Sequence, residues 1–249
     1  MHAISVRTQA LDLLRSGMSR REVCRRLGVS YNSTYRWQAR LEPAAGVAHA
    51  SCFRCLGTGP PAAPYCYLLG QYLGDGHLAM GSRAAALRIY CTTAYPAITS
   101  EVSDAMRSVM GVSVNYRDKG GCVQVQSATN HWKCLFPQHG PGMKHTRPIV
   151  LADWQRELVA ADPRPLVRGL IHSDGCRATN IIEHRLPSGI RIYAYPRYFF
   201  SNESADIRGI LTDALDLLGI AWRQNRRNSI SVARAEAVEA LDEFVGPKS

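Results

Sequence analysis

Two aspartates of this chain, Asp75 and Asp174, each follow an apolar stretch and precede a glycine. They lie at the end of two segments of similar sequence, residues 68–76 (LLGQYLGDG) and residues 167–175 (VRGLIHSDG). We expect each segment to be a helix that stops at its Asp-Gly pair, because glycine commonly ends helices. A carboxylate at a helix C-terminus costs about 0.3–1 kcal/mol, because the helix dipole is negative there. Two acids in matching positions therefore indicate a divalent metal or another positive partner between them.

Small residues line one side of each expected helix. Gly70 and Gly74 are four residues apart in the first segment, and Gly169 and Ser173 are four apart in the second. Residues four apart share a helix face, and small ones let two backbones approach closely. We therefore expect these faces to pack together and to bring the two aspartates to one edge. The alternative is that each segment is a buried helix with a glycine stop and no site.

The segments that follow the two motifs have the same order of expected elements. In the first half we expect a strand at 87–92, a helix at 96–110, a hairpin of 112–116 and 122–126, and a helix at 130–136. In the second half we expect strands within 190–200, a helix at 204–218, paired strands at 221–224 and 229–232, and a helix at 235–244. The sequence thus predicts an α+β fold with a duplicated αββαββα core. Its halves, residues 65–160 and 161–249, would be related by pseudo-twofold symmetry.

Residues 1–42 predict a small all-α domain of three helices. Ser19 and Glu22 form a capping box at the start of the second helix, Gly28 provides a tight turn, and Ser30 caps a third helix that reaches about residue 41. This layout is typical of a helix-turn-helix, whose last helix enters the major groove of DNA. Its candidate DNA-binding residues are Tyr31, Asn32, Ser33, Arg36, Gln38 and Arg40. The alternative is a three-helix module that binds protein.

Residues 43–64 are rich in Pro, Gly and Ala and predict a linker. Within it, Cys52 and Cys55 form a Cys-x-x-Cys pair, which supplies two of the four ligands that a zinc site needs. His49 and Cys66 could complete such a site. The alternative is that these are ordinary cysteines in a loop.

The composition favours a negatively charged partner. The 249 residues include 30 Lys and Arg against 20 Asp and Glu, a net charge of +10, which favours nucleic acid. No apolar run approaches the ~20 residues of a membrane span, and the N-terminus has no apolar signal core. The eight cysteines are scattered, as in proteins of a reducing compartment. We therefore expect a cytoplasmic, nucleoid-associated protein.

With its two motifs and their matching downstream order, the chain resembles the LAGLIDADG (DOD-type) homing endonucleases, in particular their two-motif monomers. The resemblance covers about residues 65–246, and residues 140–169 resemble the block between the motifs. It implies that the last acid of each motif, Asp75 and Asp174, is catalytic and binds Mg²⁺. It also implies a basic residue from the inter-motif block, for which Lys144 is the nearest match and Arg147 the next.

The sequence departs from the family pattern in two respects. The earlier acid of the motif is replaced by Leu73 in the first copy and by His172 in the second. The N-terminal helix-turn-helix is also unusual for an endonuclease. It resembles the plan of LAGLIDADG-like sporulation regulators, which join the same two folds in the other order and bind DNA without cutting it.

Together these features predict sequence-specific binding of double-stranded DNA with Mg²⁺-dependent cleavage of phosphodiester bonds. Mg²⁺ is typically held by one or two carboxylates together with waters and phosphate oxygens. We expect strands of both sheets to line the major groove with basic and polar side chains, namely Arg88, Arg117, Gln124, Gln126, Arg197, Asn202, Arg223, Arg226 and Arg227.

Three other functions are compatible with parts of the sequence. A non-cleaving transcriptional regulator would use both DNA-binding modules, but it has no need of two acids at helix ends. A transposase or integrase needs three dispersed acids on a ribonuclease-H-like sheet, and the sequence frames no such triad. A structural or protein-binding role leaves the charge of +10 unused.

Overall fold

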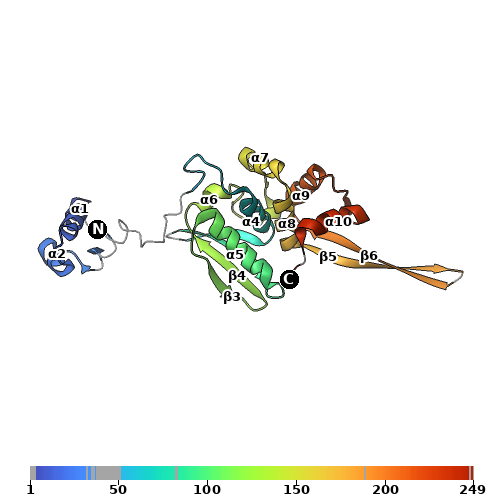
Figure 1. Ribbon diagram of the computed structural model, residues 1–249, viewed down its shortest axis with the longest axis horizontal. Coiled ribbons are helices and arrows are strands. Elements are labelled where there is room, and N and C mark those ends of the chain that lie inside the picture. The colour runs from blue at the N-terminus through green and yellow to red at the C-terminus, as the bar shows by residue number, and fades with distance from the viewer. Residues whose placement is uncertain are drawn as a thin grey trace. The chain divides into compact units, whose positions relative to one another are not determined.

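In the computed structural model, the described residues are 4–31, 33–34, 37, 52–81, 84–187, 189–246 and 248. The chain divides into two units, Met1–Ala50 and Ser51–Ser249. Figure 1 shows their helices and strands, with many of them labelled. Within the described residues, no helix has the length and apolar character that a membrane crossing requires.

The first unit begins with α1 (Ile4–Arg15) and α2 (Arg20–Leu27). Its core includes Val23, which is fully buried. The Ser19 hydroxyl accepts a hydrogen bond from the backbone N–H of Glu22 at 3.3 Å, so α2 starts with the predicted cap.

A left-handed glycine ends α2 and turns the chain toward the next helical segment. Gly28 has a φ of 63°, which favours glycine because other side chains are strained there. The Ser30 hydroxyl then accepts a hydrogen bond from the backbone N–H of Ser33 at 3.0 Å. Residues 31, 33, 34 and 37 are helical. The described part of this unit therefore has the predicted order of helix, turn and helix.

The second unit is organised around two motif helices, α4 (Ala62–Asp75) and α8 (Arg164–Asp174), which cross in close contact. A Cβ atom added to Gly70 would lie 2.6 Å from the carbonyl oxygen of Leu166 and 2.7 Å from the backbone nitrogen of Leu170. Both neighbours are backbone atoms, which cannot rotate away. The two helix backbones therefore touch where the sequence has glycine.

The remaining small residues lie in the same interface. A Cβ atom on Gly169 would overlap the carbonyl oxygen of Tyr67, and one on Gly74 would overlap the side chain of Ser173. The structure therefore confirms that the two small-residue faces pack together.

The two motif glycines serve a different purpose from the one expected. Gly76 and Gly175 have φ values of −102° in both cases, so neither adopts the left-handed conformation of a helix stop. A Cβ atom there would instead lie 2.6 Å from the Cα of Tyr72 and 2.8 Å from the Cα of Ile171, respectively. Each glycine is needed for close approach, and each is the first residue of a strand. The first strand of each half, at residues 76–80 and 175–186, therefore precedes the strands that the sequence analysis placed at 87–92 and within 190–200.

Each motif helix leads into an antiparallel sheet, and the two sheets have the same strand order. The first half contains β1 (Gly76–Met80), β2 (Ala85–Thr92), α5 (Pro96–Met110), β3 (Asn115–Asp118), β4 (Cys122–Ala128) and α6 (Trp132–Leu135), with sheet order β1-β2-β4-β3. The second contains β5 (Gly175–Leu186), β6 (Gly189–Ser201), α9 (Ala205–Leu217), β7 (Arg223–Arg226), β8 (Ser229–Val232) and α10 (Ala235–Val245), with sheet order β5-β6-β8-β7. The predicted α+β class and duplicated αββαββα order are therefore confirmed.

The connection between the halves contains a short 3₁₀ helix, η1 (Lys144–Thr146), and α7 (Asp153–Ala161). In the second half the β5–β6 ribbon extends well beyond the rest of its sheet, as Figure 1 shows. Its outer part exposes apolar side chains, among them Ile181, Ile190 and Ile192.

The contact between α4 and α8 can be tested with Gly70→Ala. We expect this substitution to lower the free energy of unfolding by about 1–3 kcal/mol, because the methyl group must push two backbones apart. Gly209→Ala is the matched control, since Gly209 also lies in a helix but has open space around its Cβ position. The control should keep or slightly raise stability. Chemical denaturation measures both, and equal effects of the two substitutions would contradict the close packing.

Candidate functional site

The last residues of the two motif helices, Asp75 and Asp174, lie close to each other. The carboxylate Oδ2 of Asp174 is 3.1 Å from the position of a Cβ on Gly74, the residue before Asp75. The pKa of Asp75 is raised to about 6, first by the loss of surrounding water and then by the negative charge of Asp174. The structure thus brings the two predicted metal-binding residues together, one from each half.

Asp174 has a partner that holds its side chain in place. The Asn202 side-chain amide donates a hydrogen bond to its carboxylate. The pKa of Asp174 is raised by burial, and the bond from Asn202 and the nearby lysine charges oppose that shift. The sequence analysis placed Asn202 among the DNA contacts, whereas here it contacts the acid and orients it.

Lys144 covers the C-terminal end of α4. Its ammonium group donates hydrogen bonds to the carbonyl oxygens of Leu73 at 2.9 Å and Gly74 at 2.8 Å, and also to that of Tyr72. Burial lowers its pKa to about 8, and the charges of the two aspartates oppose this shift. The alternative candidate, Arg147, donates to the carbonyl oxygen of Gln138. Of the two predicted basic residues, Lys144 is the one that donates to the last carbonyl groups of a motif helix.

A second lysine covers the end of the other motif helix, and sequence reasoning missed it. The ammonium group of Lys248 donates to the carbonyl oxygens of Ser173 and Gly175 at the C-terminus of α8. Its charge opposes the rise in the pKa of both aspartates. Burial in turn lowers the pKa of Lys248. The sequence offered one signal, the scarcity of lysine. The chain has only four lysines, and two of them cover these helix ends.

A cavity of about 280 Å³ borders Asp75. Its lining comes from both halves and includes Thr92, Tyr95, Ser173 and Lys248. Asp75 keeps part of its surface accessible, so its carboxylate can be reached from solvent. Asp75 therefore lies at the edge of a cavity that both halves form.

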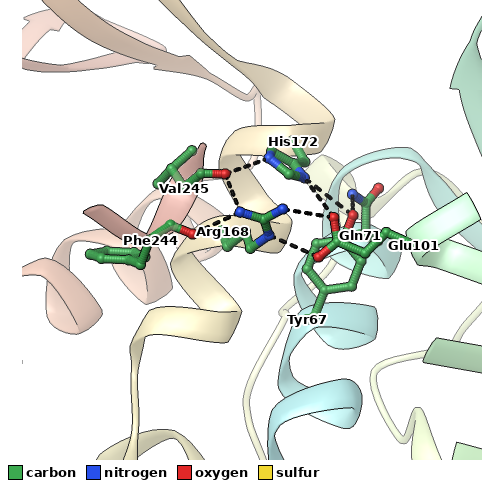
Figure 2. A network of polar contacts seen from close by, with 7 residues as sticks. All are labelled: Tyr67, Gln71, Glu101, Arg168, His172, Phe244 and Val245. Carbon is green, nitrogen blue, oxygen red and sulfur yellow. Dashed lines mark hydrogen bonds and ion pairs between the residues drawn. The ribbon is translucent and has the colours of Figure 1, made fainter. Parts of the chain in front are cut away.

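His172, which stands where the motif has an acid, is part of a buried polar network that Figure 2 shows. Its Nε2–H donates to the carbonyl oxygen of Val245 at 2.9 Å, and its Nδ1 accepts from the hydroxyl of Tyr67 at 3.2 Å. The pKa of His172 is lowered to about 4, because burial and the charge of Arg168 disfavour the imidazolium. Both ring nitrogens of the neutral imidazole are engaged, so His172 connects helices and is not available as a metal ligand.

Arg168 completes this network and joins the two halves (Figure 2). Its guanidinium donates two hydrogen bonds to Glu101 of α5, at 2.8 and 2.9 Å. It also donates to the carbonyl oxygens of Phe244, at 2.8 Å, and Val245, at the C-terminus of α10. A bidentate arginine–carboxylate pair fixes geometry as well as charge. The network therefore holds α5 of the first half against α8 and α10 of the second.

The predicted DNA contacts of the first half share one face of its sheet. Strand register places Arg88 opposite Gln126, and Gln124 opposite Arg117. Arg88 and Gln126 are half-buried and Arg117 is exposed. Gln124 is 2% exposed, accepts from Tyr90 and donates to Gln126. It has little surface to offer a ligand and instead orients Gln126.

Arginines also gather on the sheet of the second half. A cavity of about 570 Å³ is lined by Arg197, Arg223 and Arg234, with Tyr195 and Trp222. Arg234 was not among the predicted residues, because it lies in the turn before α10 rather than in a strand.

The remaining arginines differ in exposure. Arg197 is 9% exposed, and its guanidinium lies 5.5 Å from the ring centres of Tyr195 and Phe199. Arg226 and Arg227 are exposed, and Arg227 forms an ion pair with Glu203 at 2.8 Å.

Of the predicted DNA contacts in the first unit, Tyr31 and Ser33 are described. Tyr31 is 53% exposed, and the guanidinium of Arg20 lies 5.2 Å from its ring centre. Four further candidates lie outside the described residues, namely Asn32, Arg36, Gln38 and Arg40.

The Cys-x-x-Cys pair lies beside two ligand residues that the sequence analysis did not connect with it. Cys52 and Cys55 face His131 and Cys134, and the four ligand atoms all lie within 4.8 Å of one another. The expected Cys66 is instead buried in α4, and the expected His49 lies outside the described residues.

Known proteins resemble this chain in part. Residues 1–47 match the family described as Homeodomain-like domain, which agrees with the predicted helix-turn-helix. No curated protein matches the chain in sequence.

Several solved structures have a similar fold. One is the LAGLIDADG meganuclease I-AabMI bound to uncleaved DNA, at 13% identity and a TM-score of 0.47 over 73% of this chain and 82% of that chain. Another is I-DmoI in complex with DNA and Mn, at 11% identity and a TM-score of 0.47 over 74% of this chain and 97% of that chain. A third is the N-terminal LAGLIDADG domain of DUF199/WhiA, at 12% identity and a TM-score of 0.48 over 76% of this chain and 84% of that chain.

The raised pKa of Asp75 predicts that the effect of Asp75→Asn on stability depends on pH. Its folded pKa of about 6 lies above the ordinary value of 3.8, so the ionised carboxylate destabilises the metal-free fold above that pKa. As pH falls through 6 toward 4, the folded wild type takes up a proton and regains this stability. The variant should therefore melt at a higher temperature than the wild type near neutral pH, and the difference should narrow in acid.

Thermal melting in chelator at several pH values measures this difference. Asp213→Asn, which changes an exposed aspartate of α9, is the control and should show no such narrowing. A difference for Asp75→Asn that stays constant with pH would contradict the raised pKa.

Proposed function

We propose that this protein binds double-stranded DNA sequence-specifically and cleaves its phosphodiester bonds with a divalent metal held by Asp75 and Asp174. The observation that carries the proposal is the meeting of these two carboxylates at the C-termini of two packed helices. That position is electrostatically unfavourable for an acid. Neither carboxylate is needed to end its helix, because the chain continues directly into a strand. A bound cation explains why both positions hold an acid.

The donor set fits Mg²⁺. Carboxylate oxygens are the hard ligands that this ion prefers, and it commonly binds through one or two of them. Burial raises the pKa of both acids, and the charge of Asp174 raises that of Asp75 further, so a dication would relieve the repulsion. A bound Mg²⁺ would supply an activated water and neutralise charge on the leaving oxygen.

The chain's own residues would orient the substrate and balance its charge. Asn202 holds the carboxylate of Asp174 in one orientation. Lys144 and Lys248 place positive charge beside the acids, where a phosphate would approach. Because each half contributes one acid and one lysine, a duplex could meet one of each on either strand.

Two separate surfaces support binding of DNA. The first is the helix-turn-helix, which matches a homeodomain-like family and exposes Tyr31 at the start of its last helical segment. The second is the polar face of the sheets, where Arg88 and Gln126 lie opposite each other. Arginine and glutamine form paired hydrogen bonds with guanine and adenine edges in the major groove. The net charge of +10 adds attraction for phosphates.

One observation favours the alternative of a regulator that binds DNA without cutting it. Lys144 and Lys248 already compensate the charges of the two aspartates in the absence of metal. Such a site can be stable without a cation. The two functions differ in cleavage and not in binding.

Cleavage decides between them. Duplexes that the full-length protein selects from a random library are incubated with Mg²⁺ and the wild type, Asp75→Asn or Asp174→Asn. We expect the wild type to cut selected duplexes. Each variant should lose most cleavage and keep binding, because the lost carboxylate holds the metal rather than the base edges. Gel analysis measures cleavage, and fluorescence anisotropy in Ca²⁺ measures binding.

Asp213→Asn is the control for this experiment and should cleave like the wild type. If the wild type binds selected duplexes but leaves them intact with Mg²⁺ or Mn²⁺, the nuclease hypothesis is wrong and the hypothesis of a non-cleaving regulator replaces it. If Asp75→Asn and Asp174→Asn lose specific binding while Asp213→Asn keeps it, the aspartates have a structural role instead.

A further inference from the structure

Four metal-ligating side chains outside the proposed cleavage site converge from two segments that are distant in sequence. Cys52 and Cys55 come from the turn that precedes α4, whereas His131 directly precedes α6 and Cys134 lies within it. All four ligand atoms lie within 4.8 Å of one another.

Two separations within this cluster are close to those of a tetrahedral zinc site. The Sγ atoms of Cys55 and Cys134 are 3.9 Å apart, and the Sγ of Cys55 is 3.5 Å from Nδ1 of His131. Zn–S bonds of about 2.3 Å and Zn–N bonds of about 2.0–2.1 Å at tetrahedral angles separate the ligand atoms by roughly 3.6–3.8 Å. These two pairs therefore already have nearly the spacing that the ion requires, and all four ligand atoms lie within 4.8 Å of one another.

Local structure holds each pair of ligands. In the first turn, the backbone N–H of Leu56 donates to the carbonyl oxygen of Cys52 at 3.0 Å. The guanidinium of Arg54, between the two cysteines, lies 4.8 Å from the ring centre of Trp154 in α7. In the second segment, the indole N–H of buried Trp132 donates to the carbonyl oxygen of Ser127 at 3.1 Å. Hydrogen bonds and a ring contact between protein groups thus hold both pairs of ligands.

We propose that Cys52, Cys55, His131 and Cys134 bind one structural Zn²⁺. Three thiolates and one imidazole form a ligand set that suits zinc, whereas Mg²⁺ prefers oxygen ligands. Four protein ligands fill the tetrahedral shell and leave no position for a substrate. The site is therefore closed and structural, and it is separate from Asp75 and Asp174.

The zinc ion would hold the first residues of the second unit against the first half of the core. Cys52 is the second residue of the unit Ser51–Ser249, so it directly follows the segment that comes from the first unit. Its link to Cys134 closes a loop of 134 − 52 = 82 residues, which removes conformational freedom from the unfolded chain. The metal would thus attach the end of the linker to the first half of the core.

Metal content tests the site on the full-length protein. We expect the protein, expressed with zinc and purified under reducing conditions, to contain one zinc per chain by elemental analysis. Cys55→Ser and Cys134→Ser should lose most of it. Cys176→Ser is the control, since Cys176 is an exposed cysteine of β5 outside the cluster, and it should keep the full zinc content.

A second measurement covers the case in which the variants fail to fold. Wild-type protein is stripped with chelator and titrated with Co²⁺, which should produce thiolate charge-transfer bands and the visible bands of tetrahedral cobalt at one equivalent. Trypsin cleavage after Arg54 should be slow in the loaded protein and should accelerate severalfold after chelation. Loss of zinc from the control as well, absence of the cobalt bands, or a disulfide among these cysteines by mass spectrometry would overturn the proposal.

Discussion

The close approach of α4 and α8 is the contact on which the rest of the core depends. Gly70 lies against the backbone of α8, and Gly169 lies against the backbone of α4. At this separation the helices end side by side, so the residues that finish them are forced together. Gly76 and Gly175 are under a similar steric constraint. Where the chain leaves each helix, it packs against the backbone of that helix's last turn, which leaves no room for a side chain.

This geometry concentrates negative charge, and the structure compensates it in the same place. Two carboxylates and the free carbonyl groups of two helix ends meet at one point. Lys144 and Lys248, each from a different part of the chain, donate to these carbonyl groups and oppose the rise in the pKa of the acids. The neutral His172 and the Arg168–Glu101 pair then hold the neighbouring helices without adding net charge to the site. The two lysines thus offset part of the negative charge at this point.

The sequence could predict those features that depend on neighbours along the chain. The helix at 96–110 was predicted with its observed bounds, because Pro96 can start a helix and Gly111 adopts a left-handed conformation that ends it. The packing of the motif helices followed from small residues four apart. The repeated order of elements then led to the duplicated fold and to Asp75 and Asp174.

Features that depend on contacts between distant residues could not be predicted in this way. Lys248 has no motif around it and reaches α8 only in the folded chain. His131 and Cys134 lie far from Cys52 along the chain, so the sequence analysis did not connect them with the Cys-x-x-Cys pair. The role of Gly76 was also misjudged, since a close contact and a left-handed turn demand the same residue.

The central claim is that the acids of the two halves hold metal jointly. It is tested most directly by Mn²⁺ titration of the protein–duplex complex, with free Mn²⁺ followed by electron paramagnetic resonance. Asp75→Asn, Asp174→Asn and the double variant are compared with the wild type. Each single substitution should remove most of the tight Mn²⁺ binding, and the double variant should lose little more, because residues that share a ligand are not additive. Independent losses that add in the double variant, or unchanged Mn²⁺ binding in the single variants, would contradict the claim.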